Sequence, residues 1–360
     1  MKVMVLGADG YLGRPTADHL EANGHEVMRI DSFMKRHMLC DYGLKPIKEP
    51  GILGSIRACD VAGKGLEGFI RIFRPDAIIH LAELPSAPLS MRSHANAAET
   101  YKNNVMSTLN LVWAVKKHVP ECHIVKLGTM GEYGTPNIDI EEGWLDVEHK
   151  GRKDRVLYPK KPGSFYHLTK VHDSDMLAFC CRNWGMAVTD LNQGVVYGTD
   201  TGHGDTRFCY DHMFGTALNR FIVQAVAGVP LTVYGSGGQT RGWLNIKDTL
   251  ECLRLAIEHP AEEGEFRVMN QFTEQFSVLE LADLVFDVAN ACGLSPQMEH
   301  LKNPRNEMEG HYYKAEHTKL LDLGLEQTLL TTDVIHQMMD YVFSHKKNIV
   351  EKQIRPTVKW

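Results

Sequence analysis

The chain lacks the features that mark several special classes of protein. Its 360 residues contain no run of about 18 apolar residues, so we expect no membrane-spanning helix and no membrane partner. Lys and Arg number 39 against 45 Asp and Glu, and no basic stripe is present, which argues against a nucleic-acid partner. Apolar residues begin almost at the first position, so we expect no signal or transit peptide. These absences favour a cytoplasmic protein.

Cysteine is scattered and shows no regular spacing. The eight cysteines include the neighbours Cys180 and Cys181, but no CxxC pair is matched by a second one. Zinc sites and disulfide frameworks both depend on such spacing. We therefore expect no bound metal, and we expect reduced, buried thiols.

A glycine-rich turn near the start is the most informative feature that is present. An apolar run at 3–6 leads into it, and a helical stretch at 15–23 follows. Gly7 permits a tight turn, Gly10 leaves room for phosphates, and Gly13 lets the helix pack close to the strand. The pattern predicts a dinucleotide site whose turn residues are Gly7, Asp9, Gly10, Tyr11, Leu12 and Gly13.

The second predicted strand indicates which dinucleotide is expected. The strand at 26–30 ends in Asp31, whose carboxylate can bond the ribose 2′-hydroxyl of NAD and would repel the 2′-phosphate of NADP. Lys35 and Arg36 could attract such a phosphate, line the phosphates of NAD, or lie in solvent. We predict NAD. The predicted site is completed by Arg36, Asp60, Leu81, Ala82 and Asn103, and Glu83 closes the strand over the nicotinamide half.

Short apolar runs alternate with helical stretches through the first half of the chain. This alternation predicts an α/β fold: a Rossmann-type, doubly wound parallel sheet with helices on both faces. The expected strands are 2–6, 26–30, 77–81, 123–127 and 187–191, and the expected helices among them are 100–118 and 165–184. The segment 33–50 has the composition of a long loop, and 134–163 that of a polar excursion.

The pattern changes after about residue 198. Helices are expected at 214–227, 278–292 and 332–345, with a strand at 231–234. We therefore predict an NAD-binding domain at 1–198, to which part of 240–270 returns, and a smaller α-rich C-terminal substrate lobe at 199–360.

Three residues suggest redox chemistry at a hydroxyl group. Tyr166 and Lys170 lie four apart in a predicted helix and so share one face. An ammonium and a charged nicotinamide beside a phenol would lower its pKa, and the phenolate could then take a hydroxyl proton. Thr129 follows a predicted strand at the sheet edge where ligands bind, and could bond the same hydroxyl.

These residues carry a family resemblance. The chain resembles the extended short-chain dehydrogenases/reductases that act on nucleotide-diphospho-sugars, and 239–241 with 245–248 resembles their nucleotide-sugar segment. Longer strings narrow the resemblance to the UDP-sulfoquinovose synthases. These strings are 127–142, 164–167, 190–198, 214–221, 231–242, 270–277 and 352–354.

The resemblance implies a reaction in which UDP-glucose and sulfite give UDP-sulfoquinovose. Oxidation of C4 to a ketone makes the C5 proton acidic, and loss of that proton with the C6 hydroxyl gives a 4-keto-5,6-ene. Sulfite then adds at C6, and NAD is regenerated in the site. The resemblance further implies that Tyr166 is the base and that Lys170 and Thr129 assist it. It also implies that the chain forms a homodimer through helices such as 100–118 and 165–184.

The elimination step needs a further acid and base. Related 4,6-dehydratases carry an Asp-Glu pair after the Thr, but this chain has Met130 and Gly131, which transfer no proton. Glu132 and His167 are the nearby candidates, although each could equally be structural. For the substrate we predict contacts from Thr129, Gln193, Arg220, Gln239, Arg241 and Arg305.

One departure from the resemblance bears on sulfite. The family usually has an Arg just before 86–88, where this chain has Pro85. His203 or Arg207 could supply the missing positive charge, or their loop could be a disordered lid. Two alternatives remain: a nucleotide-sugar 4-epimerase that uses the same Thr, Tyr and Lys without sulfite, and a non-catalytic NAD-binding protein. The intact Tyr166–Lys170 pair argues against the second.

Overall fold

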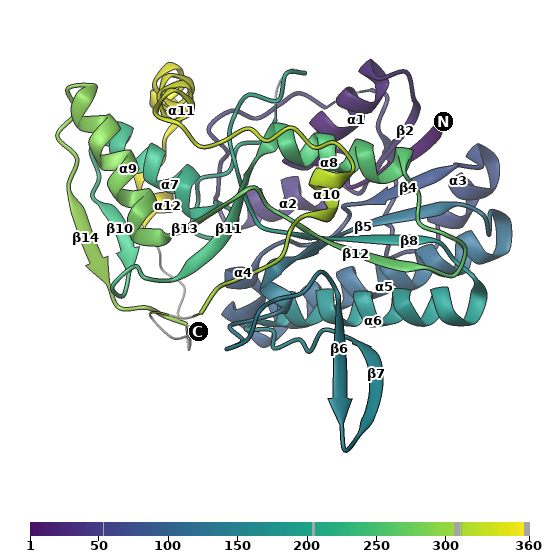
Figure 1. Cartoon of the computed structure of the whole chain (residues 1–360). Helices are drawn as coiled ribbons and strands as arrows, with labels where there is room; N and C mark the ends of the chain where they lie inside the picture. The colour runs from purple at the N-terminus through teal and green to yellow at the C-terminus, as the bar shows by residue number, and fades with distance from the viewer. Residues whose placement is uncertain (53, 204–205, 306–309, 311, 356–360) are drawn as a thin grey trace.

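Seven parallel strands form the central sheet, six from residues 2–193 and one from residues 266–271 (Figure 1). The computed structural model describes all residues except 53, 204–205, 306–309, 311 and 356–360. The strand order is β12-β8-β5-β4-β1-β2-β3. Its strands are β1 (Lys2–Leu6), β2 (Glu26–Asp31), β3 (Arg57–Ala58), β4 (Ala77–His80), β5 (His123–Thr129), β8 (Val188–Gln193) and β12 (Phe266–Gln271).

Helices cover both faces of this sheet, as a doubly wound fold requires. Apolar side chains of α3, α5 and α6 pack on one face, and those of α1, α8 and α10 pack on the other. The helices of the first face are α3 (Leu66–Phe73), α5 (His94–His118) and α6 (Phe165–Trp184). Those of the second are α1 (Gly13–Ala22), α8 (Ile246–Glu258) and α10 (Lys319–Asp322). The predicted α/β Rossmann-type fold is confirmed.

A separate apolar core lies in the C-terminal part. It is built from three helices and two small sheets, whose buried members include Phe221, Leu281 and Met338. The helices are α7 (Ala217–Ala227), α9 (Val278–Ala291) and α11 (Thr332–Ser344), followed by the short α12 (Glu351–Ile354). The sheets are β13-β11-β9 and β10-β14, from β9 (Val195–Tyr197), β10 (Leu231–Tyr234), β11 (Thr240–Asn245), β13 (Glu274–Ser277) and β14 (Met298–Leu301).

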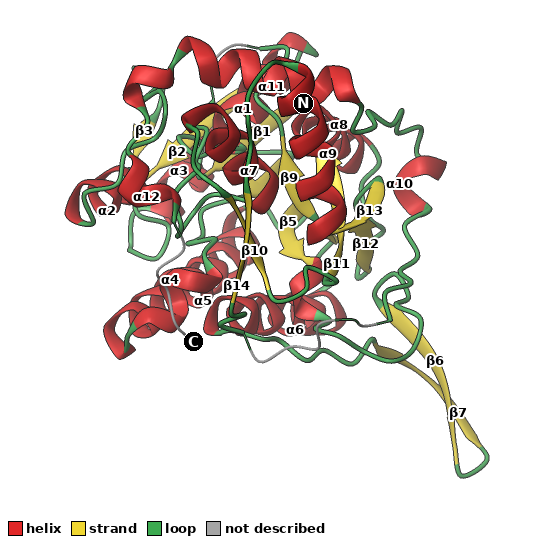
Figure 2. Cartoon of the chain, turned by 90° about the vertical axis from the view of Figure 1, so that its left-hand side faces the viewer, coloured by secondary structure: helices red, strands yellow, loops and turns green. Residues whose placement is uncertain are grey.

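The two segments without a predicted element both contain one. Within 33–50 lies α2 (Met34–Asp41), so the expectation of a loop there is wrong. Its N-cap is Phe33, at φ 58°, and no side chain caps the helix. Within 134–163 the strands β6 (Trp144–His149) and β7 (Arg152–Leu157) form a hairpin that projects from the body (Figure 2). Two further short helices are α4 (Ala87–Arg92) and the 3-10 turn η1 (Met130–Glu132).

The structure bears on membrane-spanning helices and on the state of the cysteines. Within the described residues, none of the helices combines the length and apolar character needed to cross a membrane. All eight cysteines are free thiols, but Cys40 and Cys292 are exposed and Cys59 is half-buried, so the expectation that the thiols are buried is wrong for these three.

Candidate active site

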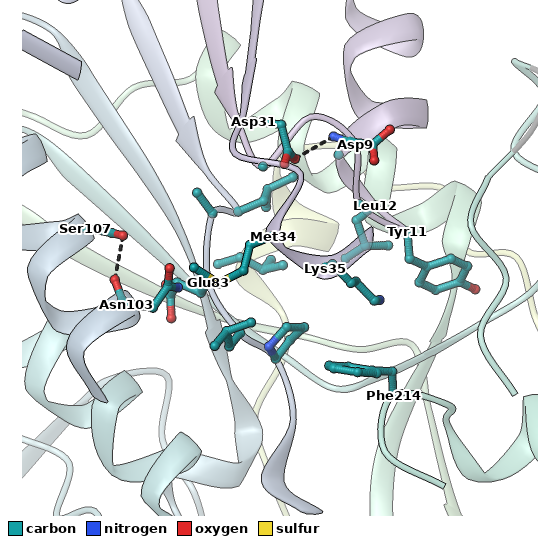
Figure 3. Close-up of a pocket in the computed structure, with 18 of the residues that line it drawn as sticks. Asp9, Tyr11, Leu12, Asp31, Met34, Lys35, Glu83, Asn103, Ser107 and Phe214 are labelled. Carbon is teal, nitrogen blue, oxygen red and sulfur yellow. Dashed lines mark hydrogen bonds between the residues drawn. The ribbon is translucent and has the colours of Figure 1, made fainter. Parts of the chain in front are cut away.

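A cavity of about 340 Å³ lies at the carboxyl ends of the central strands. This is the edge at which open α/β sheets bind ligands. Its walls run from the glycine-rich turn after β1, past Asp31 and Leu81, to Thr129 at the end of β5 and to Tyr166 and Lys170 on α6. Figure 3 shows Asp9 and Asp31 at one end of the pocket and Glu83 and Asn103 farther along it.

The glycine-rich turn has the geometry that a dinucleotide requires. Gly7 has φ +87°, and a Cβ there would lie 2.6 Å from the carbonyl carbon of Leu81. A Cβ on Gly13 would lie 1.9 Å from the carbonyl oxygen of Gly7, so only glycine lets α1 approach the turn so closely. The turn and the helix N-terminus behind it therefore fit a bound pyrophosphate.

Most of the predicted cofactor residues line the cavity. They are Gly7, Asp9, Gly10, Tyr11, Leu12, Gly13, Asp31, Asp60, Leu81, Ala82 and Asn103. The carboxylate of Asp31 accepts hydrogen bonds from the backbone N–H of Asp9 (2.8 Å) and of Phe33 (2.6 Å). Burial raises the pKa of Asp31, and these two donors oppose the rise.

Arg36 does not itself line this cavity, so its predicted contact with the cofactor stays a prediction. Its guanidinium holds the carboxylate of Asp9, with Nε at 2.6 Å from Oδ2 and Nη2 at 2.7 Å from Oδ1. It therefore contacts the glycine-rich turn through Asp9 rather than facing the cofactor pocket.

At the other end of the cavity, Lys170 is held by two partners. Its ammonium lies 2.8 Å from Oε2 of Glu83 and donates to the carbonyl of Leu127 at 2.5 Å. It also lies 5.9 Å from the centre of the Tyr166 ring. Burial raises the pKa of Tyr166, and Lys170 opposes the rise. The predicted lowering of this pKa is thus not found in the chain alone.

Glu132 faces away from the cavity into a buried group of charges. Four fully buried residues, Lys126, Glu132, Ser174 and Asp190, make up this group. We call it the base cluster, in the sense of a foundation and not of a proton acceptor. The ammonium of Lys126 lies 3.3 Å from both carboxylates and donates to the carbonyl of Lys170 at 3.0 Å. The cluster therefore supports the α6 turn that carries Lys170.

The contacts of Glu132 contradict its predicted role as an acid, and its side chain does not line the cavity. Its carboxylate accepts from Lys160 (2.5 Å) and from the backbone N–H of Thr129 (3.2 Å). Burial acts to raise its pKa, but Lys126 and Lys160 outweigh this and lower it to about 2. A carboxyl group that stays ionised at neutral pH and is enclosed by cations cannot donate a proton to a substrate.

His167 lies beside Tyr166, with ring centres 5.1 Å apart, but does not itself line the cavity. Its Nδ1 is 3.1 Å from the hydroxyl of Ser164, the N-cap of α6. A Cβ on Gly131 would lie 2.4 Å from Nε2 of His167, so the imidazole occupies space that a side chain at 131 would need. Burial, with Arg305 and Arg241 nearby, lowers the pKa of His167 to about 3, so the ring is neutral at pH 7.

The predicted substrate residues fall into two groups. Thr129 and Gln193 line the cavity. Arg220, Gln239, Arg241 and Arg305 do not, but the charges of Arg241 and Arg305 act on His167, and that of Arg305 acts on Arg220. The three arginines therefore gather beyond the Tyr166 end. Gln239 is buried and donates to the carbonyl of Tyr234 at 3.2 Å, while its Oε1 has no hydrogen-bond partner among the described residues.

Neither residue suggested as a replacement for the missing charge at Pro85 serves that role. Pro85 lines the cavity, but Arg207 pairs with Asp9, and His203 lies 2.8 Å from Nδ1 of His19. Among the described lining residues, Lys35 and Lys170 are the cationic side chains. Sequence reasoning missed the pairing of Glu83 with Lys170 and the wall formed by Cys209, Phe214, Thr216 and Asn219. No spacing in the sequence signals either.

The cavity brings a dinucleotide turn and a Thr, Tyr and Lys set into one space. When bound there, NAD would supply a hydride acceptor and donor. Within the part of the chain that the structure describes, no cluster of three or more His, Cys, Asp or Glu side chains is arranged to hold a metal ion.

Comparisons with known proteins agree with this geometry. The model of the NAD dependent epimerase/dehydratase family matches residues 3–270. The UDP-sulfoquinovose synthase of Spinacia oleracea is 48% identical over the whole chain and 79% of its own length. That of Sulfolobus acidocaldarius is 39% identical over the whole chain and 98% of its own length.

The fold is also shared with solved structures. A UDP-glucuronic acid 4-epimerase from Bacillus cereus, solved with UDP-glucuronic acid and NAD, superposes with a TM-score of 0.72 at 22% identity. The superposition covers 96% of this chain and 99% of that one.

Proposed function

The chain belongs to the NAD dependent epimerase/dehydratase family and, within it, to the UDP-sulfoquinovose synthases; from this membership we propose that it converts UDP-glucose and sulfite to UDP-sulfoquinovose. It is an enzyme, and NAD is its cofactor. One observation carries the proposal. Thr129, Tyr166 and Lys170 line the same cavity as the glycine-rich turn, so the hydroxyl chemistry and the cofactor share one space.

Tyr166 is the proposed base at the C4 hydroxyl. Lys170 stabilises its phenolate, since the ammonium acts to lower the phenol pKa against the effect of burial. The hydroxyl of Thr129 accepts from the backbone N–H of Gly131 at 3.2 Å and keeps its own proton to donate to the substrate oxygen. The Glu83–Lys170 contact at 2.8 Å fixes the ammonium near the ring.

His167 is the proposed group for proton transfer at C5 and C6. It stands in the space that Gly131 leaves free, where the related dehydratases have a carboxylate side chain. A neutral imidazole accepts a proton at its unprotonated ring nitrogen, so His167 would take the proton from C5 and then, as imidazolium, deliver that proton to the leaving C6 hydroxyl. Glu132 has the separate proposed role of holding Lys126 and the backbone of Thr129 in place.

Arg220, Arg241 and Arg305 are the proposed contacts for the diphosphate and the sugar. Burial lowers the pKa of Arg220, which indicates a desolvated cation, and such a cation is stabilised by a bound anion. Arg241 and Arg305 also place positive charge near His167, which favours an anionic co-substrate such as sulfite there.

Product analysis tests the reaction. The NAD-loaded enzyme is incubated with UDP-glucose, with and without sulfite, and the products are separated and weighed by mass spectrometry. We expect the mass of the sulfonated nucleotide-sugar only with sulfite. A C4 epimer that forms at the same rate in both samples would contradict the proposal and identify a 4-epimerase, which Pro85 permits.

We further propose a homodimer that forms through α5 and α6. Large apolar side chains are exposed on these two helices, among them Trp113 (53%) and Phe179 (47%). The helices form the layer below the sheet in Figure 1. An exposed patch of this kind is typical of an interface. Light scattering should give about twice the chain mass of 40.6 kDa, and a mass of one chain would contradict this.

A further inference from the structure

A segment from the second half of the chain crosses the glycine-rich turn. We call residues 206–216 the strap. The hydroxyl of Thr206 donates to the carbonyl of Tyr11, and Cys209, Phe214 and Thr216 line the cavity. Phe208 and Tyr210 are fully buried in the C-terminal core. One side of the strap is thus anchored in the C-terminal part, while the other forms a wall of the cofactor cavity; Phe214 is seen facing Lys35 in Figure 3.

One buried ion pair joins the strap to the turn. Arg207 is 1% exposed, and its Nη2 lies 2.6 Å from Oδ2 of Asp9, a residue 198 positions earlier. Its Nη1 lies 2.6 Å from Oε1 of Glu49, and its Nε lies 3.4 Å from the carbonyl oxygen of Asp9. A single guanidinium therefore links the strap to the turn and to the segment that follows α2.

The position of Asp9 explains why cationic side chains surround its carboxylate. Asp9 is 4% exposed and lies within the turn that fits a pyrophosphate, so an uncompensated carboxylate there would repel the ligand. Two other arginines also contact this carboxylate. Arg36 of α2 holds it, and Nη2 of Arg14 in α1 lies 3.4 Å from its Oδ1. Arg207 is the member of this group that comes from the strap. We call Asp9, Arg36, Glu49 and Arg207 the strap cluster.

We propose that Arg207 is a positioning residue that retains NAD by keeping the strap closed over it. This inference rests on the proposed function, in which C4 is first oxidised and later reduced, so that an enzyme molecule that lost its cofactor in between would leave the sugar unfinished. Cofactor exit past the strap requires the Arg207–Asp9 contact to break. The strap cluster thus sets the rate at which cofactor escapes, without touching the reacting atoms.

The test measures cofactor release with no sugar and no sulfite present, so its outcome does not depend on the proposed reaction. Purified holoenzyme is diluted into excess unlabelled NAD, and loss of bound radiolabelled NAD is followed by rapid filtration. Truncating one partner of a buried charge pair acts mainly on dissociation. We expect release from Arg207→Ala to be faster by about tenfold or more.

Arg29→Ala is the matched control. Arg29 is also a buried arginine that holds two carboxylates, Asp18 at 2.6 Å and Glu21, but it lines neither the cavity nor the strap. Its release rate should equal that of the unaltered enzyme. If Arg29→Ala releases NAD as fast as Arg207→Ala, the effect is general destabilisation and the proposal is wrong.

Arg207→Lys is a second, milder variant that keeps the test possible if Arg207→Ala does not fold. Lysine keeps the charge but not the fork that reaches both Asp9 and Glu49, so its release rate should fall between those of Arg207→Ala and the unaltered enzyme. Thermal unfolding confirms that each variant is folded. A folded Arg207→Ala or Arg207→Lys that releases NAD at the unaltered rate would overturn the proposal.

Discussion

The two charge clusters at the ends of the cavity are built differently. The base cluster draws its members from β5, η1, α6 and β8, neighbouring elements of one sheet and the helix packed on it, and all are buried. The strap cluster joins the glycine-rich turn and α2 to a loop from the other half of the chain, and Glu49 within it is 44% exposed at its side chain. The residues of the base cluster cannot separate unless the sheet and α6 unfold. The strap cluster can separate when the strap alone moves away from the glycine-rich turn.

This difference indicates a division of labour. Catalytic groups must keep their geometry through every step, so a rigid foundation below Lys170 suits them. A cofactor must enter at least once and then stay, which suits a contact that is buried yet formed between separate segments.

Tyr166→Phe should have the largest effect. Removing the base should lower kcat by about a thousandfold, within the range known for general acid–base catalysis. Bound NAD should stay, since the strap cluster is untouched. Steady-state assays and the NAD content of the purified protein check both points. Turnover at the unaltered rate would refute the proposed base, and loss of NAD would show that the two ends are coupled.

Glu132→Gln should destabilise the protein more than any change in the strap cluster. The amide leaves Lys126 and Lys160 short of one buried negative charge, and breaking such a pair typically costs about 3–5 kcal/mol. Urea unfolding measures the loss. Release of NAD from the folded variant should not change, and faster release would mean that the base cluster also holds the cofactor site.

The carboxylate of Glu132 should also make the stability of the protein depend on pH in the acid range. The pKa of Glu132 is lowered from its ordinary 4.5 to about 2 in the folded chain. A lowered pKa gives stability that is present above pH 4.5 and is lost as the pH falls towards 2, an effect of about 3 kcal/mol for such a shift. The free energy of unfolding of Glu132→Gln should therefore depend less on pH than that of the unaltered chain between these values. Parallel curves would contradict this.

Lys170→Met should lower kcat/KM by about a hundredfold and move the pH profile. Without the ammonium, the pKa of Tyr166 rises further, because burial and Glu83 both raise it. The pH of half-maximal rate should shift upwards. Adding Glu83→Gln to Lys170→Met should return part of that shift, because it removes the carboxylate left unpaired. A loss of rate with no shift would mean that Lys170 acts by some route other than the phenol.

The predictability of the two regions also differs. Tyr166, Lys170 and Thr129 were predicted because one helix and one strand end carry them, and α6 matches its predicted range of 165–184. The hairpin β6–β7 turns through Lys150 and Gly151, which both have positive φ, but only the glycine is a residue typical of such a turn, so its sequence signal is weak. The start of α2 at Phe33 has no side-chain cap and no acidic first turn, so it carries no such signal.

Ion pairs between distant segments cannot be predicted from the sequence, for a different reason. Arg207 and Asp9 are 198 residues apart, and nothing in either local pattern identifies its partner. The same holds for Glu83 with Lys170, which meet only because β4 and α6 converge on the cavity. Sequence periodicity reports contacts within an element or between successive elements, and it carries no information on which loop crosses which turn.

Glu49→Gln should have the smallest effect and sharpens the comparison most. Glu49 contacts the same guanidinium as Asp9 does, but its side chain is 44% exposed, whereas that of Asp9 is 4% exposed. Exposed ion pairs contribute little because water and salt screen them. We expect NAD release to quicken by less than about threefold, and by less still at high salt. Asp9→Asn, measured alongside, should exceed it clearly, since it takes one buried negative charge away from the three guanidiniums of Arg14, Arg36 and Arg207. Equal effects from both variants would mean that burial does not decide which contact holds the strap, and that the strap is held by its backbone packing instead.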